Sequence, residues 1–172
     1  MTGALDGVRV LELSRYIAAP IVGKALGEMG ADVVKVEDPS GGDPMRRWQS
    51  GDRPHSPQFA VYNRTKRGIT LDLKSEEGKE VFLTLADTAD VVLENFRPRV
   101  MDRLGLGWET LAARNPRLIY CAISGFGEDG PLVDRPAYDT VISAMSGLYS
   151  QVLDPAAPQP VGPAFSDLIA GM

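Results

Sequence analysis

Short apolar runs alternate along this chain with longer segments in which apolar residues recur at helical spacing. The apolar runs predict strands at residues 8–13, 32–36, 68–72, 90–94 and 118–123. The longer segments predict helices at 20–29, 75–86 and 108–114, with Gly30 ending the first and Ser75 capping the second. Strands that alternate with helices in this way are joined by right-handed crossovers. The pattern therefore predicts an α/β fold with a doubly wound, mostly parallel sheet and helices on both faces.

The pattern is interrupted by two long connections, at residues 37–67 and 124–135, and by a Pro-rich passage after Leu153. A last apolar pattern begins at Phe165. Long connections in a compact domain are more often functional than idle, so both are candidates for function.

The composition fits a single domain and argues against some classes of binding partner. The chain has 172 residues, of which 44% are hydrophobic, and a net charge of −5. General binding to nucleic acid or to a membrane surface usually needs a basic excess, so neither is expected, and any phosphate site must be local. No apolar segment approaches membrane-spanning length, and the N-terminus lacks the basic head of a leader.

The chain has a single cysteine, Cys121, and a single histidine, His55. One cysteine excludes an internal disulfide and favours a reducing compartment, so we expect a cytoplasmic protein. Cys121 lies in a predicted strand and is interpreted as a small core residue, and His55 as a surface residue of a polar loop. Together they supply too few ligands for a conventional zinc site, so no metal is expected.

Polar residues are concentrated where the fourth predicted strand stops. The run Val91-Val92-Leu93 ends in Glu94-Asn95-Phe96-Arg97-Pro98, and a basic segment follows as far as Arg103. Ligands of open α/β sheets bind outside the carboxyl ends of the strands, so these residues are candidates for holding an anionic group. Lys74 follows the third strand and is expected to reach the same edge.

The first strand-helix-strand unit allows a test for dinucleotide binding. Glu37 and Asp38 follow the second strand, where dinucleotide-binding proteins keep the acid that binds ribose. The turn after the first strand reads Ser14-Arg15-Tyr16-Ile17-Ala18-Ala19-Pro20 and has none of the glycines that let a backbone approach a pyrophosphate. Nicotinamide or flavin binding is therefore not expected.

Four segments in register carry a family resemblance. They are Gly30-Ala31-Asp32-Val33-Val34-Lys35-Val36-Glu37, Lys66-Arg67-Gly68-Ile69-Thr70-Leu71-Asp72-Leu73-Lys74, Glu94-Asn95-Phe96-Arg97-Pro98 and Gly125-Phe126-Gly127. With them the chain resembles, over nearly its whole length, the class III CoA-transferases, a family that includes formyl-CoA and carnitine CoA-transferases and the related α-methylacyl-CoA racemases. The resemblance implies the Rossmann-like large domain of that family.

The resemblance also implies a nucleophile and a set of CoA contacts. The nucleophile of the family's transferases, an aspartate near the start of a helix, matches Asp167. We expect Ser166 to cap that helix, the helix dipole to favour the ionised carboxylate, and backbone donors there to stabilise a tetrahedral oxyanion. The family's CoA contacts match Ile17, Ala18, Leu71, Asp72, Leu73, Lys74, Asn95, Phe96, Arg97, Arg103, Tyr138 and Asp139.

Three positions depart from the family's pattern. Asp38 stands where formyl-CoA transferase carries an arginine, and Pro136 stands where it carries a lysine. Arg15 or Arg135 is therefore expected to replace a nucleotide contact. Tyr138 stands where the racemases carry a proton-transferring histidine, and an unassisted tyrosine is a poor base near neutral pH.

The implied activity is the movement of CoA between an acyl-CoA thioester and a small free carboxylic acid, through a covalent aspartyl intermediate and without ATP or a metal. An acyl-CoA racemase or isomerase of the same family, or a CoA-binding fragment without catalysis, remain alternatives. Members of this family continue well beyond the point that matches residue 172, into a smaller second domain, and interlock as homodimers. We therefore expect residues 1–172 to form the N-terminal part of the large CoA-binding domain, incomplete at its C-terminus and without the second domain. Such a chain, acting alone, is expected to bind CoA weakly and to turn over nothing.

Overall fold

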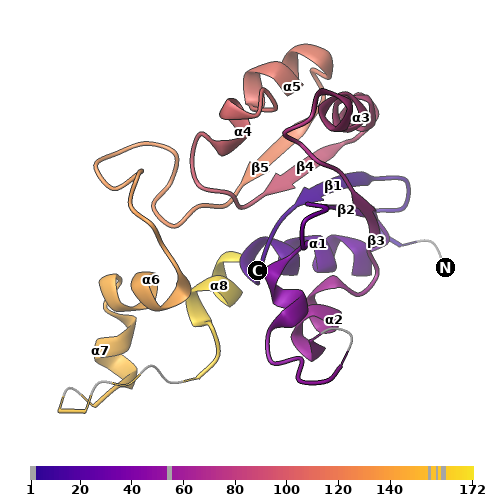
Figure 1. Ribbon diagram of the computed structural model, residues 1–172. Helices are drawn as coiled ribbons and strands as arrows, with labels where there is room; N and C mark the ends of the chain where they lie inside the picture. The colour runs from indigo at the N-terminus through magenta and orange to yellow at the C-terminus, as the bar shows by residue number, and fades with distance from the viewer. Residues whose placement is uncertain (1–2, 54–55, 155, 158, 160–161) are drawn as a thin grey trace.

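The chain folds into a five-stranded parallel sheet covered by helices on both faces (Figure 1). The computed structural model describes residues 3–53, 56–154, 156–157, 159 and 162–172. The strands are β1 (Arg9–Leu13), β2 (Asp32–Glu37), β3 (Arg67–Thr70), β4 (Val91–Glu94) and β5 (Ile119–Ala122). The helices are α1 (Ala18–Glu28), α2 (Pro57–Asn63), α3 (Glu76–Ala86), α4 (Val100–Arg103), α5 (Trp108–Arg114), α6 (Asp139–Met145), α7 (Leu148–Val152) and α8 (Phe165–Ala170), with a short 3-10 helix η1 (Pro44–Arg47).

The strand order is β3-β2-β1-β4-β5, and every neighbouring pair is parallel. This is the order of doubly wound nucleotide-binding sheets, in which the direction of winding reverses between β1 and β4. The register pairs Leu13 with Glu94 and Glu37 with Thr70, so the carboxyl ends of β1, β4, β2 and β3 lie at one edge. The predicted fold class is confirmed.

Alternate residues of the strands face two separate cores. Leu11 of β1 packs in a cluster with Phe82 of α3 and Leu111 of α5. Val10, its neighbour in the sequence, packs in a second cluster with Ala19 of α1. Figure 1 shows α3, α4 and α5 on one side of the sheet and α1 with α2 on the other. Because both faces of the sheet are covered, β1, β2 and β4 carry apolar residues at consecutive positions, as in Val33-Val34 and Val91-Val92-Leu93.

The predicted helix ends and strand positions are largely confirmed. Gly30 follows α1 with a φ of +107°, and Ser75 Oγ accepts the Gly78 N–H at 3.0 Å at the start of α3. The third strand runs from residue 67 to residue 70, slightly earlier than predicted. Cys121 is half-buried at the margin of the core around α1, and His55 lies outside the described residues.

The connection at residues 37–67 was predicted to be a loop, and that prediction was wrong because it contains η1 and α2. The Asp43 carboxylate caps η1, and Ser56 Oγ caps α2 by accepting the Phe59 N–H at 2.9 Å. Helices η1 and α2 span only four and seven residues, and a segment of that length shows at most a weak helical period. The similarly short α4, α6 and α7 also escaped prediction, whereas the seven-residue α5 was predicted. The connection at 124–135 has neither helix nor strand, as predicted.

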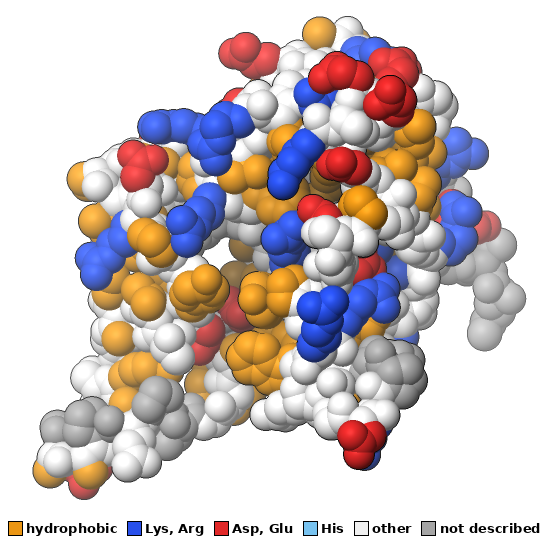
Figure 2. All heavy atoms as spheres, in the orientation of Figure 1, with side chains coloured by type: hydrophobic (Ala, Val, Ile, Leu, Met, Phe, Trp, Pro, Cys, Tyr) orange, Lys and Arg blue, Asp and Glu red, His pale blue; other side chains and the backbone are white. Residues whose placement is uncertain are grey.

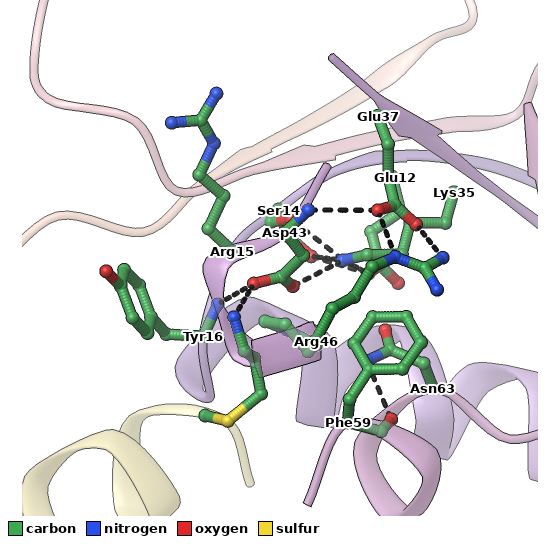
Figure 3. A network of polar contacts seen from close by, with 12 residues as sticks. Glu12, Ser14, Arg15, Tyr16, Lys35, Glu37, Asp43, Arg46, Phe59 and Asn63 are labelled. Carbon is green, nitrogen blue, oxygen red and sulfur yellow. Dashed lines mark hydrogen bonds and ion pairs between the residues drawn. The ribbon is translucent and has the colours of Figure 1, made fainter. Parts of the chain in front are cut away.

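Four buried charged side chains join β1, β2 and the connection between β2 and β3, and Figure 3 labels three of them, Glu12, Lys35 and Asp43. Lys35 Nζ lies 3.1 Å from Glu12 Oε1 and 3.2 Å from Asp43 Oδ2, and Lys66 Nζ lies 2.8 Å from the Glu12 carboxylate. Glu12, Lys35 and Asp43 are almost fully buried. Burial lowers the pKa of Lys66 to about 8. This buried charge cluster contains two acids and two lysines. Because each charge has a partner of opposite sign, the free-energy cost of burying it is largely offset.

Gly23 of α1 lies against the buried charge cluster, and the substitution Gly23→Ala tests that packing. A Cβ at Gly23 would lie 1.7 Å from Glu12 Oε2 and 3.2 Å from Lys66 Nζ. Because the methyl group must displace a buried carboxylate from its partner, we expect the free energy of unfolding in urea to fall by about 1–3 kcal/mol. The matched control is Gly68→Ala, since a Cβ there meets nothing within 4 Å. The control should change the free energy of unfolding by less than about 0.5 kcal/mol, and equal losses from the two substitutions would contradict the packing.

Candidate functional site

A groove of about 210 Å³ opens at the carboxyl ends of β1, β2, β3 and β4. Its apolar lining includes Leu13, Leu71, Leu73 and Phe96, which end or directly follow three of these strands. This is the edge at which open α/β sheets bind their ligands. Figure 2 shows Lys and Arg side chains, with acidic ones among them, around a hollow on one face of the molecule.

Acidic side chains that line the groove are bound to partners within the protein. Glu37 pairs with Arg46 at 2.7 Å, and Asp38 accepts the Ser40 N–H at 2.7 Å. Asp43 belongs to the buried charge cluster. The negative charge of the groove wall is therefore partly offset by fixed donors, which lowers the cost of bringing an anion near it.

Arg15 and Lys74 supply positive charge to the groove. Neither forms an ion pair within the part of the chain that the structure describes. Hydrogen bonds from Ser40 lower the pKa of Asp38, and the charges of Lys74 and Arg15 lower it further, so both cations lie near this carboxylate. The Arg15 guanidinium lies 5.4 Å from the centre of the Phe96 ring. Two cations, an aromatic ring and leucines suit a ligand with phosphate and apolar parts.

Asn95 and Glu94 fix the backbone where β1 and β4 end. Asn95 Oδ1 accepts the Arg15 N–H and Asn95 Nδ2 donates to the Arg15 carbonyl oxygen, both at 2.8 Å. Glu94 Oε2 accepts the Phe96 N–H at 2.7 Å, and burial raises the pKa of Glu94 to about 7. Since its amide already bonds the Arg15 backbone, Asn95 shapes the groove by holding the neighbouring loop.

Asp167 lies in the first turn of α8, beside Asp139 at the start of α6. Asp139 Oδ1 accepts the N–H groups of Ser166 at 2.7 Å and of Asp167 at 3.2 Å. Burial, with the nearby Asp139 carboxylate, raises the pKa of Asp167 to about 6. The expectation that the helix start favours the ionised carboxylate is therefore wrong, because burial and a like charge outweigh the dipole of so short a helix. Ser166 does not cap α8 either: the cap residue is Ala164, and Ser166 Oγ bonds Ser143 Oγ at 2.8 Å.

Helix α8 packs against the start of α1. A Cβ at Gly171 would lie 2.5 Å from the Ala18 carbonyl oxygen, so the two backbones are in close contact. Ile17 is the cap residue of α1, and α6 packs against the other side of α8. Helix α8, which carries Asp167, thereby packs against the start of the helix that follows the Arg15 loop.

The structure brings most sequence-predicted residues into two groups. The first group lines the groove and comprises Arg15, Leu71, Asp72, Leu73, Lys74 and Phe96. Asn95 does not line the groove but bonds the backbone of Arg15. The second group lies where α1, α6 and α8 meet and comprises Ile17, Ala18, Asp139 and Asp167. Arg97 and Arg103 are exposed and do not line the groove, and Tyr138 is 64% exposed. Arg135, the other expected replacement for a nucleotide contact, is exposed and lies outside the groove lining, whereas Arg15 lines it.

Sequence reading gave no role to Lys35 and Asp43. A lysine between the valines of a buried strand was the available signal for Lys35, since an unpaired charge cannot stay in a core. Asp43 carried no signal, because its partners lie in other segments of the chain. No helix in the described ranges is long and apolar enough to cross a membrane. Nor do the described residues include a group of three or more His, Cys, Asp or Glu side chains that could hold a metal ion.

Comparisons with known proteins agree on one family. A family model described as CoA-transferase family III matches residues 5–172. The succinate–glutarate CoA-transferase of Agrobacterium fabrum is 42% identical over 176 aligned residues, which cover 98% of this chain and 44% of that protein. The acetyl-CoA:oxalate CoA-transferase of Acetobacter aceti is 42% identical over 99% of this chain and 44% of its own length.

The same agreement is seen among solved structures. The crystal structure of a CAIB/BAIF family protein from Brucella suis matches with a TM-score of 0.92 at 44% identity. The match covers 99% of this chain and 47% of that chain. The chain thus spans less than half the length of these relatives.

The raised pKa of Asp167 predicts a pH-dependent difference between the wild type and Asp167→Asn. The folded state favours the protonated carboxyl of Asp167. The stabilisation that this carboxyl contributes is therefore fully present below the ordinary pKa of an aspartate and is lost as the pH rises through about 6. Relative to Asp167→Asn, the wild type should lose about 1–2 kcal/mol of unfolding free energy between pH 4 and pH 7, after allowance for partial exposure. Urea unfolding at several pH values measures this difference. Asp87→Asn is the control, because Asp87 is exposed, pairs with Arg114 and has a lowered pKa; the same trend in both variants would refute the assignment.

Proposed function

The chain belongs to CoA-transferase family III, and from that premise we propose that it forms the CoA-binding part of an enzyme that transfers CoA between an acyl-CoA thioester and a small carboxylic acid. The observation that carries the proposal is the convergence of Arg15, Lys74, Phe96 and two leucines at the carboxyl edge of the sheet. Phosphate groups of CoA bind the two cations, and the adenine or pantetheine part lies against the apolar side chains.

Asp167 is the proposed nucleophile. Its carboxylate attacks the thioester carbonyl of the donor, the C–S bond breaks, and a mixed acyl-aspartyl anhydride and CoA thiolate result. The thiolate attacks the aspartyl carbonyl, which releases the donor carboxylate and leaves an aspartyl-CoA thioester. The acceptor carboxylate then attacks this thioester, and the returning thiolate takes the acceptor acyl group and frees Asp167. Every step exchanges one acyl bond for another, so neither ATP nor a metal is needed.

The surroundings of Asp167 support a nucleophile that works near neutral pH. With a pKa of about 6 the carboxyl is mostly ionised at pH 7, yet it is more basic than an ordinary aspartate and correspondingly more nucleophilic. Asp139 contributes to this shift and holds the start of α8 through two backbone bonds. Because the N–H groups of Ser166 and Asp167 donate to Asp139, donors for a tetrahedral oxyanion come from another segment.

The proposal extends to the complete protein. Residues 1–172 are the N-terminal part of its large domain, and the protein is a cytoplasmic homodimer in which two subunits interlock. The remaining contacts expected from the sequence, Arg97, Arg103 and Tyr138, reach CoA only when this larger assembly is formed. Alone, the chain binds CoA weakly and is inactive.

A covalent intermediate on Asp167 is tested by trapping. The complete protein containing this chain is incubated with acyl-CoA donors, treated with hydroxylamine and digested, and the peptide containing Asp167 is examined by mass spectrometry. We expect a hydroxamate at Asp167, and CoA transfer lowered at least about 10³-fold in Asp167→Asn, because the nucleophile of a covalent mechanism is removed. Asp134→Asn, which alters an exposed carboxylate, is the control and should leave both results unchanged.

The same protein distinguishes the alternatives. A transferase moves label from acyl-CoA to an added carboxylic acid, whereas a racemase or isomerase exchanges the α-proton of acyl-CoA with deuterium from solvent in the absence of an acceptor. A CoA-binding protein without catalysis does neither. An unmodified Asp167 in a preparation that is active in transfer would overturn the aspartyl mechanism.

Lys74→Ala tests the phosphate contact in the groove. Since one cation is lost, we expect CoA to bind about tenfold more weakly in calorimetry at low salt, while pantetheine, which lacks the phosphates, should bind as before. Lys79→Ala is the matched control, because Lys79 pairs with Glu76 on α3 and does not line the groove. Equal losses for CoA and pantetheine would place the phosphates elsewhere.

A further inference from the structure

The loop between β1 and α1 is held by side chains from three other segments. Lys35 Nζ, in β2, donates to the Ser14 carbonyl oxygen at 2.8 Å. Asn95, after β4, accepts from the N–H and donates to the carbonyl oxygen of Arg15, both at 2.8 Å. Asp43 Oδ1, between β2 and β3, accepts the Tyr16 N–H at 3.1 Å. Four consecutive polar groups of the backbone, from the Ser14 carbonyl to the Tyr16 amide, are thus each bonded to a side chain.

The residue at the centre of this loop has a conformation that normally calls for glycine. Tyr16 has a φ of +64°, in the left-handed region that is unfavourable for a residue with a Cβ. Nucleotide-binding loops at this position in doubly wound sheets use glycines to turn tightly. This chain has no glycine between Ser14 and Pro20. A glycine would adopt this conformation without strain. In its absence, hydrogen bonds with Lys35, Asp43 and Asn95 stabilise the loop.

We infer that Lys35, Asp43 and Asn95 are positioning residues that hold the β1–α1 loop in the shape in which the groove receives its ligand. The inference rests on the proposed function in one respect, that the ligand is CoA. The loop matters because it carries Arg15, whose side chain lines the groove over Phe96. Figure 3 shows the Arg15 side chain directed away from the buried charge cluster, while the backbone beside it is anchored to Asp43.

The charge cluster gives this anchor its rigidity. Asp43 is 1% exposed, and its second carboxylate oxygen lies 3.2 Å from Lys35 Nζ. Lys35 in turn bonds Glu12 Oε1 at 3.1 Å and Ser14 Oγ at 3.1 Å. Neither Asp43 nor Lys35 can rotate without leaving a charge unpaired in the core, so the Tyr16 amide is bonded to a fixed acceptor.

Asn95→Ala tests the inference with a variant that is expected to fold, because Asn95 is only partly buried. In the complete protein, hydrogen exchange of the Arg15 amide should become at least about tenfold faster, and CoA should bind about tenfold more weakly, since two hydrogen bonds to the loop are lost. Asp43→Asn, which keeps an oxygen acceptor for Tyr16 but loses the charge that holds Lys35, should change both quantities in the same direction. Asp87→Asn, in an exposed ion pair with Arg114, is the control and should change neither quantity.

A second substitution separates positioning from direct contact with the ligand. Tyr16→Gly removes the strain of the left-handed residue, so in the Asn95→Ala background it should restore at least about half of the lost affinity on a logarithmic scale. Such rescue is not expected if Asn95 touches CoA itself, and its absence would overturn the inference. Faster exchange at Arg15 with unchanged CoA affinity would also overturn it, while leaving the proposed function intact. A wild-type protein that binds no CoA would overturn both.

Discussion

The pairing of two acids with two lysines in the core is the interaction on which the rest of the structure depends. Glu12 lies on β1 and Lys35 on β2, and Asp43 and Lys66 come from the long connection to β3. An unpaired charge at any of these positions would be costly, so the three segments can only fold together. The same contacts fix the carboxyl ends of the strands, and with them the shape of the groove.

The proposed CoA groove lies beside a β1–α1 loop that has no glycine. Glycine-rich loops bring the backbone close to a phosphate because they carry no side chains. Here the loop keeps its side chains, a tyrosine occupies the left-handed position, and an arginine extends from the neighbouring residue toward the ligand edge. Arg15 and Lys74 are the cations of the groove lining, and its four acids are each bound to donors of the protein.

The proposed binding groove and the proposed nucleophile are joined by helix α1. The groove lies over the ends of the strands, whereas Asp167 lies at the junction of α8 with α1 and α6. Helix α1 connects the two, because it begins directly after the loop that carries Arg15 and packs against α8. A carboxyl with a pKa of about 6 beside a second carboxylate is an arrangement that a protein keeps for chemistry more often than for stability, since both burial and repulsion work against folding.

The sequence by itself determined the five strands, the longer helices, the parallel sheet and the edge at which polar residues gather, because these follow from local periodicity and from where apolar runs stop. It also carried the family resemblance that marked Asp167, although the expected cap at Ser166 was wrong and burial raises the pKa of Asp167 where the helix start was expected to favour ionisation. Only the tertiary structure decided which residues share the groove, that Arg97 and Arg103 lie outside it, and that Asn95 holds a loop. The reason is physical. The pKa of Asp167 depends on burial and on a neighbouring charge, and the hydrogen bonds that hold the β1–α1 loop join residues as much as 80 positions apart. A local sequence pattern contains neither kind of information.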